Sequence, residues 1–261
     1  MLKPLENYLL LTNGKIKRDK LFELIFFDLI LTGVLTITKE NNKKKTSFII
    51  KKGTNYKDYT PRKFENPFID MLDKGLVCQL TQYIRIVNEL IGTPRSVISM
   101  MLKSSEFSNY AKSSFFSSFK LKKKGLAELK KLNTLLSSKQ KGTLLNNLDL
   151  LESINLLGSN ILLIEGVKLS DIVEEIKKID SKTLQTFTTN IPDIHFPLII
   201  LSDNHELLSN MSHDFDATSF GDINTSIDGI VSDSTDSHSG DSNCSNCGAS
   251  CGASCGSGCS N

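Results

Sequence analysis

The 261-residue sequence has no long uncharged hydrophobic run and no common nucleotide-binding motif. Its best apolar stretch, residues 21–37, has 17 residues and contains Glu23 and Asp28, whereas a membrane-spanning helix needs about 20 apolar residues. Neither GxGxxG nor GxxxxGK[ST] occurs, and the GxSxG nucleophile motif is missing as well. The sequence therefore favours a soluble globular chain without a recognisable phosphate-binding loop.

Catalytic residues cannot be assigned from the sequence, and neither can cofactor-binding residues. Cys78 stands alone, and the first histidine is His195, so a packing role for this thiol is more common than a Cys–His pair. No basic segment followed by an uncharged apolar stretch and a small-residue cleavage site opens the chain. We therefore predict a non-enzymatic, cytoplasmic protein, in a compartment where disulfides do not persist.

Charge is divided sharply along the chain. Residues 1–182 hold all 31 Lys and Arg together with 19 acidic residues, a net charge of +12. Residues 183–261 hold ten acidic residues and no base, a net charge of −10. A basic body can meet an anionic membrane surface, a nucleic acid or an acidic protein, or it can attract its own acidic tail.

The first 63 residues predict a helix, a second helix and a hairpin, the order in which a winged-helix unit ends. Residues 5–12 form the first helix, and Asn13-Gly14 predicts a turn after it. The second helix, from about residue 18 to Gly33, is apolar almost all round and must be buried. Two β-rich runs separated by NNKKK follow as the hairpin.

The chain after residue 63 is predicted to consist of three regions. Residues 64–136 are predicted to form a second helical or winged-helix-like unit, with helices over 67–75 and 79–91. A third helix starts with Thr93 as N-cap and Pro94 at the first helical position and continues over 95–103. A last helix turns Leu126, Leu129 and Leu132 inward, and residues 104–119 resist assignment. Residues 137–209 predict a helical extension, and residues 210–261 a disordered acidic tail. The predicted fold class is mainly α with small β-hairpins and a disordered C-terminal tail.

Five cysteines within 16 residues close the tail, separated by Gly, Ala, Ser and Asn; they are Cys244, Cys247, Cys251, Cys255 and Cys259. Thiolates on flexible spacers can converge on a soft metal such as Zn or Cu(I). The alternative is a flexible tail with free thiols. The histidines and carboxylates of residues 203–216 could also ligate a metal, but the spacing of His205 and His213 does not match the His-Glu-x-x-His helix, so a solvated polar tail is the better interpretation.

Sequence-specific DNA binding is disfavoured. A recognition helix needs outward-facing Arg, Asn or Gln, whereas the helix at that position, LFELIFFDLIL, is apolar with two acidic residues. Lysine clusters at residues 43–45, 51–52 and 120–124 leave non-specific phosphate contact open.

The segments LENYLLLTNG, KLFELIFFDLILTGVLTI and KLKKKGLAELKKL, with the tail CSNCGASCGASCGSGC, together resemble a group of uncharacterised bacterial winged-helix-like proteins with a Gly-, Ser- and Cys-rich C-terminal tail. A weaker similarity, through Leu9 to Leu11 and Leu29 to Leu35, is to the Golgi phosphoprotein family, which implies phosphoinositide binding. We therefore expect an interaction or scaffold protein with a protein partner and a thiol-rich tail; the alternative is a peripheral membrane protein that binds anionic lipid or phosphoinositide through its basic body.

Overall fold

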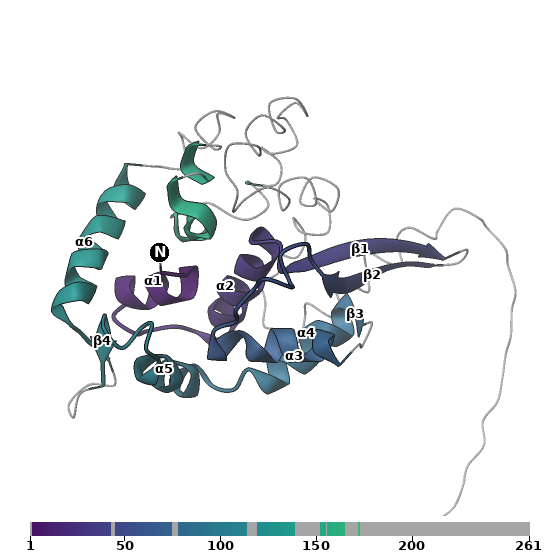
Figure 1. Cartoon of the computed structure of the whole chain (residues 1–261), viewed down its shortest axis with the longest axis horizontal. Coiled ribbons are helices and arrows are strands. Elements are labelled where there is room, and N and C mark those ends of the chain that lie inside the picture. Colours follow the sequence, from purple (N-terminus) through teal and green to yellow (C-terminus); the bar gives the residue numbers. More distant parts are fainter. Residues whose placement is uncertain are drawn as a thin grey trace, which may run out of the picture.

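The computed structural model describes residues 2–42, 45–74, 78–113, 119–138, 152–154, 156–164 and 172. Its helices are α1 (Pro4–Leu11), α2 (Arg18–Leu31), α3 (Asn66–Asp73), α4 (Leu80–Leu90), α5 (Pro94–Lys103) and α6 (Lys123–Ser137), with short 3-10 helices η1 (Lys63–Glu65) and η2 (Gly158–Leu163). Its strands are β1 (Leu35–Asn42), β2 (Lys45–Lys52), β3 (Cys78–Gln79), β4 (Ala111–Lys112) and β5 (Lys120–Leu121). Figure 1 shows their arrangement.

Local sequence signals set the ends of these helices. The turn after α1 contains Asn13 and Gly14 at positive φ, a conformation that these two residue types tolerate best. At the start of α5, the Thr93 side chain accepts a hydrogen bond from the Ser96 amide, and Pro94 occupies the first helical position. The predictions of a turn at residues 13–14 and of a helix start at residue 93 are confirmed.

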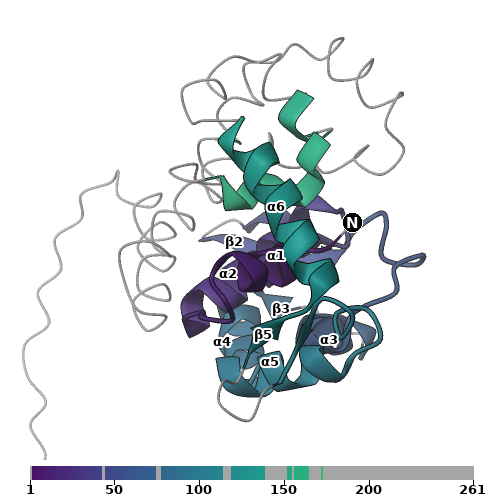
Figure 2. The same cartoon turned by 90° about the vertical axis from the view of Figure 1, so that its left-hand side faces the viewer.

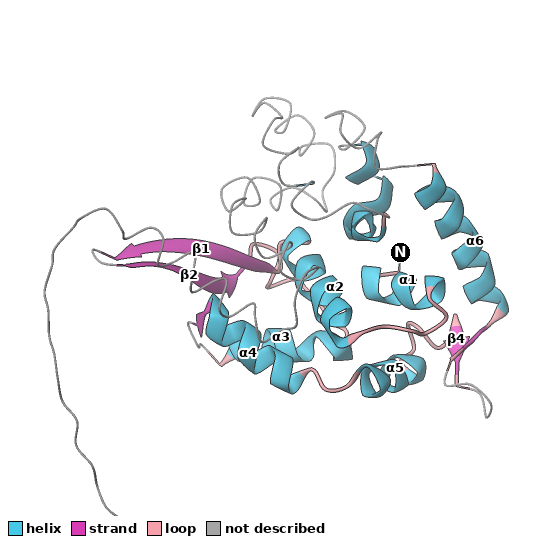
Figure 3. Ribbon diagram, turned by 180° about the vertical axis from the view of Figure 1, so that it is seen from behind, coloured by secondary structure: helices cyan, strands magenta, loops and turns pink. Residues whose placement is uncertain are grey.

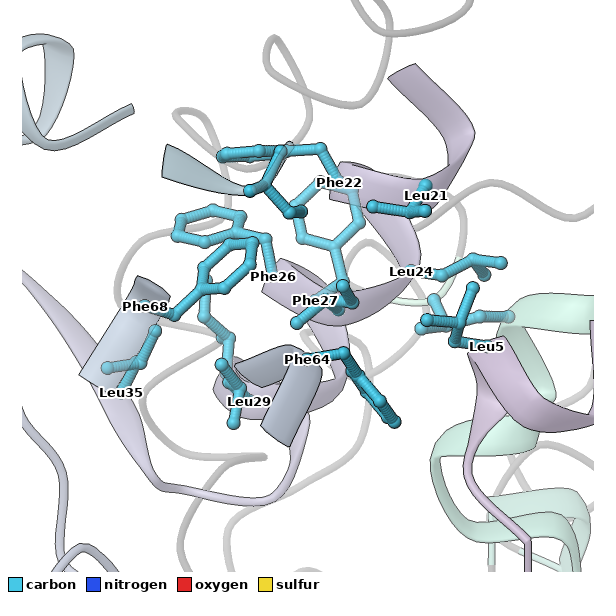
Figure 4. Close-up of a cluster of buried hydrophobic side chains, with 14 of the residues drawn as sticks. Leu5, Leu21, Phe22, Leu24, Phe26, Phe27, Leu29, Leu35, Phe64 and Phe68 are labelled. Carbon is cyan, nitrogen blue, oxygen red and sulfur yellow. The ribbon is translucent and has the colours of Figure 1, made fainter. Parts of the chain in front are cut away.

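The core is built around α2. Phe22 and Phe26 of this helix pack on Phe68 of α3, with ring centroids 5.1 and 6.5 Å from it, and Phe26 also meets Tyr83 of α4 (Figure 4). Because apolar side chains leave α2 in every direction, the helix is covered on all sides, as its composition predicts. One hydrophobic cluster joins α2 to residues as far apart in sequence as Leu2 and Ile172.

The larger sheet is antiparallel, with strand order β1-β2-β3. The hairpin ladder runs from Leu35 opposite Lys52 to Asn42 opposite Lys45. At its base the Gly53 amide donates to the Val34 carbonyl, and a Cβ on Gly53 would come 2.1 Å from the Gly33 oxygen. The hairpin extends from the end of the molecule opposite α6 (Figures 1 and 3).

The first helix lies in the interior. It contacts α2, α6 and η2, so that α1 is covered by elements from both ends of the described chain (Figures 1 and 3). The Asn7 side chain donates to the Asn160 side chain, and both amides donate to the Leu2 carbonyl. These bonds attach the start of the chain to η2.

The predicted helix with Leu126, Leu129 and Leu132 on its inner face forms as α6, but its orientation is wrong at Leu126, and Leu129 is only partly buried. Leu132 is 2% exposed, as expected, whereas Leu126 is 56% exposed. Six residues make about 1.7 turns of an α-helix, so Leu126 cannot share the face of Leu132. Gly125, seven residues before Leu132, lies on that buried face, where its missing side chain lets the first turn of α6 approach the Tyr110 carbonyl. The segment 104–119, which the sequence left unassigned, contains turns and the short strand β4 in its described part.

At the level of fold class, the prediction of a mainly helical protein with small β-hairpins is confirmed. The arrangement alone does not establish a winged-helix topology. The predicted tail, residues 210–261, lies outside the described residues, as does most of the extension over 137–209.

Candidate functional site

Six side chains form a buried polar cluster, called here the Lys3 cluster: Lys3, Glu6, Asp28, Tyr59, Arg62 and Glu65. The three acidic residues are among the most buried polar residues described, with exposures of 1% for Glu6, 3% for Asp28 and 0% for Glu65. They come from α1, α2 and η1, so the cluster joins three separate elements. Buried carboxylates require pairing and hydrogen bonding, because desolvation costs several kcal/mol per ion.

The Lys3 ammonium is the centre of this cluster. Its Nζ lies 2.6 Å from Glu65 Oε1 and 3.4 Å from Asp28 Oδ2, and it also donates to the Tyr59 hydroxyl. The same ammonium lies 4.6 Å from the centre of the Tyr59 ring. One cation therefore serves two carboxylates, and a phenol shields it from water.

Backbone amides bind one carboxylate oxygen of Glu6 and one of Glu65. The Lys3 amide donates to Glu6 at 2.9 Å, as expected for the first turn of a helix. The Arg62 amide donates to Glu65 Oε2 at 2.7 Å, and the Tyr59 hydroxyl donates to the same oxygen at 2.8 Å. The Arg62 guanidinium links the cluster to the surface, since it lies 3.6 Å from Glu6 and 3.3 Å from the half-exposed Glu106.

Burial raises the pKa of Glu6, of Asp28 and of Glu65, because desolvation outweighs the neighbouring cations at each carboxyl. Lys3 opposes this increase in all three, and Arg62 opposes it at Glu6. The pKa of the Tyr59 hydroxyl is raised by burial and by the Glu65 charge, so this phenol stays a hydrogen-bond donor. The cluster is thus a site that favours bound protons.

A similar trio lies exposed on another part of the molecule. Lys52 Nζ lies 2.9 Å from Asp73 Oδ1, the Tyr56 hydroxyl donates to the same oxygen, and Lys52 lies over the Tyr56 ring. Here the pKa of Asp73 is lowered, because hydrogen bonds from Lys52 and Tyr56 outweigh desolvation. The Lys52–Tyr56–Asp73 trio has the same residue types as Lys3, Tyr59 and Asp28 but is exposed. It is therefore a control for the effect of burial.

A second feature is a basic surface, called here the α6 lysine surface. It consists of seven exposed lysines on β4, β5 and α6: Lys112, Lys120, Lys122, Lys123, Lys124, Lys130 and Lys131. Figures 1 and 2 show α6 along one side of the molecule, with the short strands at its N-terminal end. Within the described part of the chain, none of these lysines forms an ion pair with a carboxylate.

This surface is arranged at a cost to stability. Lys112 and Lys120 are direct partners in the β4–β5 ladder, and like charges in that position repel each other. Lys122, Lys123 and Lys124 begin α6, where the helix dipole disfavours cations, and the first turn contains no acidic residue. Only the Lys124 ammonium has a described partner, the Tyr110 ring at 4.5 Å. Unfavourable local choices of this kind are expected at functional or strained sites.

Leu126 lies within the basic surface. On a helix, residues three and four positions apart share a face, so Leu126 lies beside Lys122, Lys123 and Lys130. Its side chain is 56% exposed, and it is one of four large exposed apolar residues in the described chain. The outer face of α6 therefore combines positive charge with one accessible apolar side chain.

The residues predicted from the sequence fall in different places. The five tail cysteines lie outside the described residues, so the predicted metal site stays a prediction. Cys78 lies in β3, where its backbone pairs with Ile50 of β2. Lys51 and Lys52 pair with Glu40 and Asp73, whereas the cluster at residues 120–124 belongs to the α6 lysine surface.

The Lys3 cluster was missed by sequence reasoning, although one signal pointed to it. Asp28 interrupts a helix that is otherwise apolar on all sides, and a buried acid requires a buried partner. No sequence signal identified Lys3 as that partner.

Among the described residues, no group of three His, Cys, Asp or Glu is arranged to hold a metal ion. No helix in the same residues is long and apolar enough to cross a bilayer.

Comparison with protein-family models, with curated proteins and with solved structures finds no match for this chain.

Proposed function

We propose that this chain is a non-enzymatic interaction protein that binds an anionic lipid surface through the α6 lysine surface. The observation that carries the proposal is the exposed Leu126 among Lys122, Lys123 and Lys130 on the outer face of α6. The proposal selects the peripheral-membrane alternative for the body of the protein, because the supporting residues lie in the described chain.

Electrostatic attraction supplies the first part of the binding. Each lysine near an anionic bilayer contributes about 1 kcal/mol, and the attraction falls off within a Debye length, about 10 Å at 0.1 M salt. The seven lysines have no acidic partner in the described chain to compete with lipid headgroups. Binding should therefore weaken steeply as salt is added.

Leu126 favours a membrane over a nucleic acid. A bilayer offers an apolar interior to an exposed leucine, whereas a phosphate backbone does not. Burial of α2 also supports this choice, because that helix cannot enter a DNA groove. Partition of the Leu126 side chain into the acyl region contributes up to about 2 kcal/mol.

Vesicle sedimentation tests the electrostatic part. The full chain should pellet with phosphatidylcholine vesicles that contain phosphatidylserine and stay in solution with phosphatidylcholine alone. Replacement of Lys122, Lys123 and Lys130 by Gln should abolish pelleting. The same charge change at Lys57, Lys63 and Lys74, all exposed elsewhere, should have a much smaller effect. If both triple variants lost vesicle binding equally, binding would depend only on the net charge of the protein, which would contradict the proposed surface.

Fluorescence tests the role of Leu126. The protein contains no tryptophan, so Leu126→Trp introduces a single indole. We expect a blue shift of its emission on addition of anionic vesicles and no shift with duplex RNA. Leu90→Trp is the control, since Leu90 is 58% exposed at the end of α4. A blue shift with RNA but not with vesicles would instead identify a nucleic-acid surface.

The proposal also includes the sequence predictions of a winged-helix unit, a thiol-rich tail, a cytoplasmic location and a protein partner. The proposal includes a winged-helix-like unit over residues 1–63, with the β1–β2 hairpin as the wing; the order α1, α2, β1, β2 supports it, because a winged-helix module ends with helix, helix and hairpin. The tail cysteines, from Cys244 to Cys259, supply a soft-metal or thiol-rich segment beside the membrane-binding body. A cytoplasmic location agrees with both, because anionic lipids face that compartment and thiols stay reduced there. A protein partner remains part of the proposal as well.

A further inference from the structure

Asp28 is the least compensated of the three buried acids. Its side chain is 4% exposed and comes from the last turn of α2, where the negative end of the helix dipole disfavours a carboxylate. Apolar residues occupy the positions around it on this helix, including Ile25 and Leu29. An ionised carboxyl in this place needs strong partners.

The other two acids have such partners. Glu65 accepts from the Lys3 ammonium at 2.6 Å, from the Tyr59 hydroxyl and from the Arg62 amide. Glu6 accepts from the Lys3 amide at 2.9 Å and lies beside the Arg62 guanidinium. Both of these carboxylates are therefore solvated by the protein in their ionised form.

Asp28 has fewer hydrogen-bond donors around it than Glu65 has. In the described chain these are the Lys3 ammonium, at the longer distance of 3.4 Å, and the Ser159 hydroxyl from η2. The Lys3 ammonium is held closer to Glu65 than to Asp28. The Asp28 and Glu65 charges repel each other, so ionising both carboxyls at once is disfavoured. Three buried carboxyls share two cations, Lys3 and Arg62, so full ionisation leaves one buried negative charge uncompensated.

We propose that the Lys3 cluster is a proton-binding site, and that Asp28 holds the proton at neutral pH. The neutral carboxylic acid removes the uncompensated charge and leaves Glu65 as the ionised partner of Lys3. When the pH rises far enough to ionise Asp28, the contacts of α2 with the start of α1 and with η2 are weakened. The site thus makes attachment of the first helix depend on pH.

The raised pKa of Asp28 agrees with this assignment, because desolvation is its largest cause. The sign follows from linkage: when the folded-state pKa lies above the unfolded value, stability is fully present below the unfolded pKa and is lost as pH rises through the folded pKa. One extra bound proton makes the unfolding equilibrium constant grow up to about tenfold per pH unit in that range.

Infrared spectroscopy of the full-length protein tests the proposal. Exposed acids are ionised at neutral pH, so a carbonyl band of a protonated carboxylic acid should come from this site. We expect the band in the wild type, its loss in Asp28→Asn, and its retention in the control Asp73→Asn. Isotope labelling of aspartate carboxyls in the wild type should shift the band, which identifies an aspartic acid without any substitution.

Thermal unfolding supplies the second readout. Between neutral and mildly alkaline pH, wild type and Asp73→Asn should lose stability with rising pH, whereas Asp28→Asn should lose less. Absence of the band from the wild type at neutral pH would overturn the proposal. A band that does not move with aspartate labelling, or that persists in a folded Asp28→Asn variant, would place the proton on another group and overturn the assignment to Asp28.

Discussion

The Lys3 ammonium and the Glu65 carboxylate lie 2.6 Å apart inside the protein, although 62 residues separate them in the sequence. The pair attaches the start of α1 to the short helix η1. It also explains how the partly exposed Lys3 side chain compensates buried acids, because its ammonium meets two carboxyls and a tyrosine hydroxyl.

Removing the cation should destabilise the fold strongly. In Lys3→Met the Glu65 carboxylate keeps only neutral donors, and the loss of one partner of a buried ion pair costs about 3–5 kcal/mol. Urea unfolding at neutral pH measures this loss. Lys52→Met is the matched control, since it removes the cation of the exposed Lys52–Tyr56–Asp73 trio and should change stability little. Similar losses in both variants would contradict a special role for burial.

The wild type should be more stable at mildly acidic pH than at neutral pH. The pKa of each buried acid, Glu6, Asp28 and Glu65, is raised, so the folded state binds more protons than the unfolded state and the free energy of unfolding falls as pH rises. Unfolding curves from about pH 5 to about pH 8 check the sign. A stability that rises steadily over this range would show that these carboxyls are ionised more easily inside the protein than in the unfolded chain.

Gly125→Ala should destabilise the protein even though alanine favours helices by about 1 kcal/mol over glycine. An added Cβ at this position would lie 2.1 Å from the Tyr110 carbonyl oxygen, so backbone would have to move. We expect a loss of about 1–3 kcal/mol, as for other overpacked sites. Ala127→Gly, at an exposed position of α6, should lose about 1 kcal/mol from propensity alone. A gain of stability in Gly125→Ala would refute the close approach.

The tail cysteines should bind a soft metal together. Replacement of Cys244, Cys247, Cys251, Cys255 and Cys259 by serine should abolish binding of Zn or Cu(I) and the accompanying proton release, both measurable by calorimetry. Cys78→Ser is the control and should retain binding. If the five-serine variant binds as much metal as the wild type, the ligands lie elsewhere, and if neither binds, the thiols are free.

Local patterns predicted the elements well, because their causes are local. Thr93 and Pro94 start α5 through contacts within one turn, and Gly33 ends α2 through its own backbone. The prediction that Leu126 is buried was wrong, since the helical period gives the spacing of residues on a face but does not say which face meets the rest of the protein. In the structure the buried face of α6 includes Gly125, which lies against the Tyr110 carbonyl, and Tyr110 belongs to a segment the sequence left unassigned.

The Lys3 cluster could not be predicted for a related reason. Its members are spread from residue 3 to residue 65, and no spacing rule connects a lysine before the first helix to an acid inside the second. Asp28 alone signalled a buried charge. The identity of its partners required the three-dimensional path of the chain.

The side-chain bond between Asn7 and Asn160 spans 153 residues and has a consequence for synthesis of the protein. Asn7 of α1 is synthesised 153 residues before Asn160, so the contacts of α1 are incomplete until that residue has emerged. At translation rates of about 5–20 residues per second, that interval lasts roughly 8–30 seconds. During this time α1 can already pack on α2, but its contacts with η2 are missing, so this apolar helix stays incompletely covered.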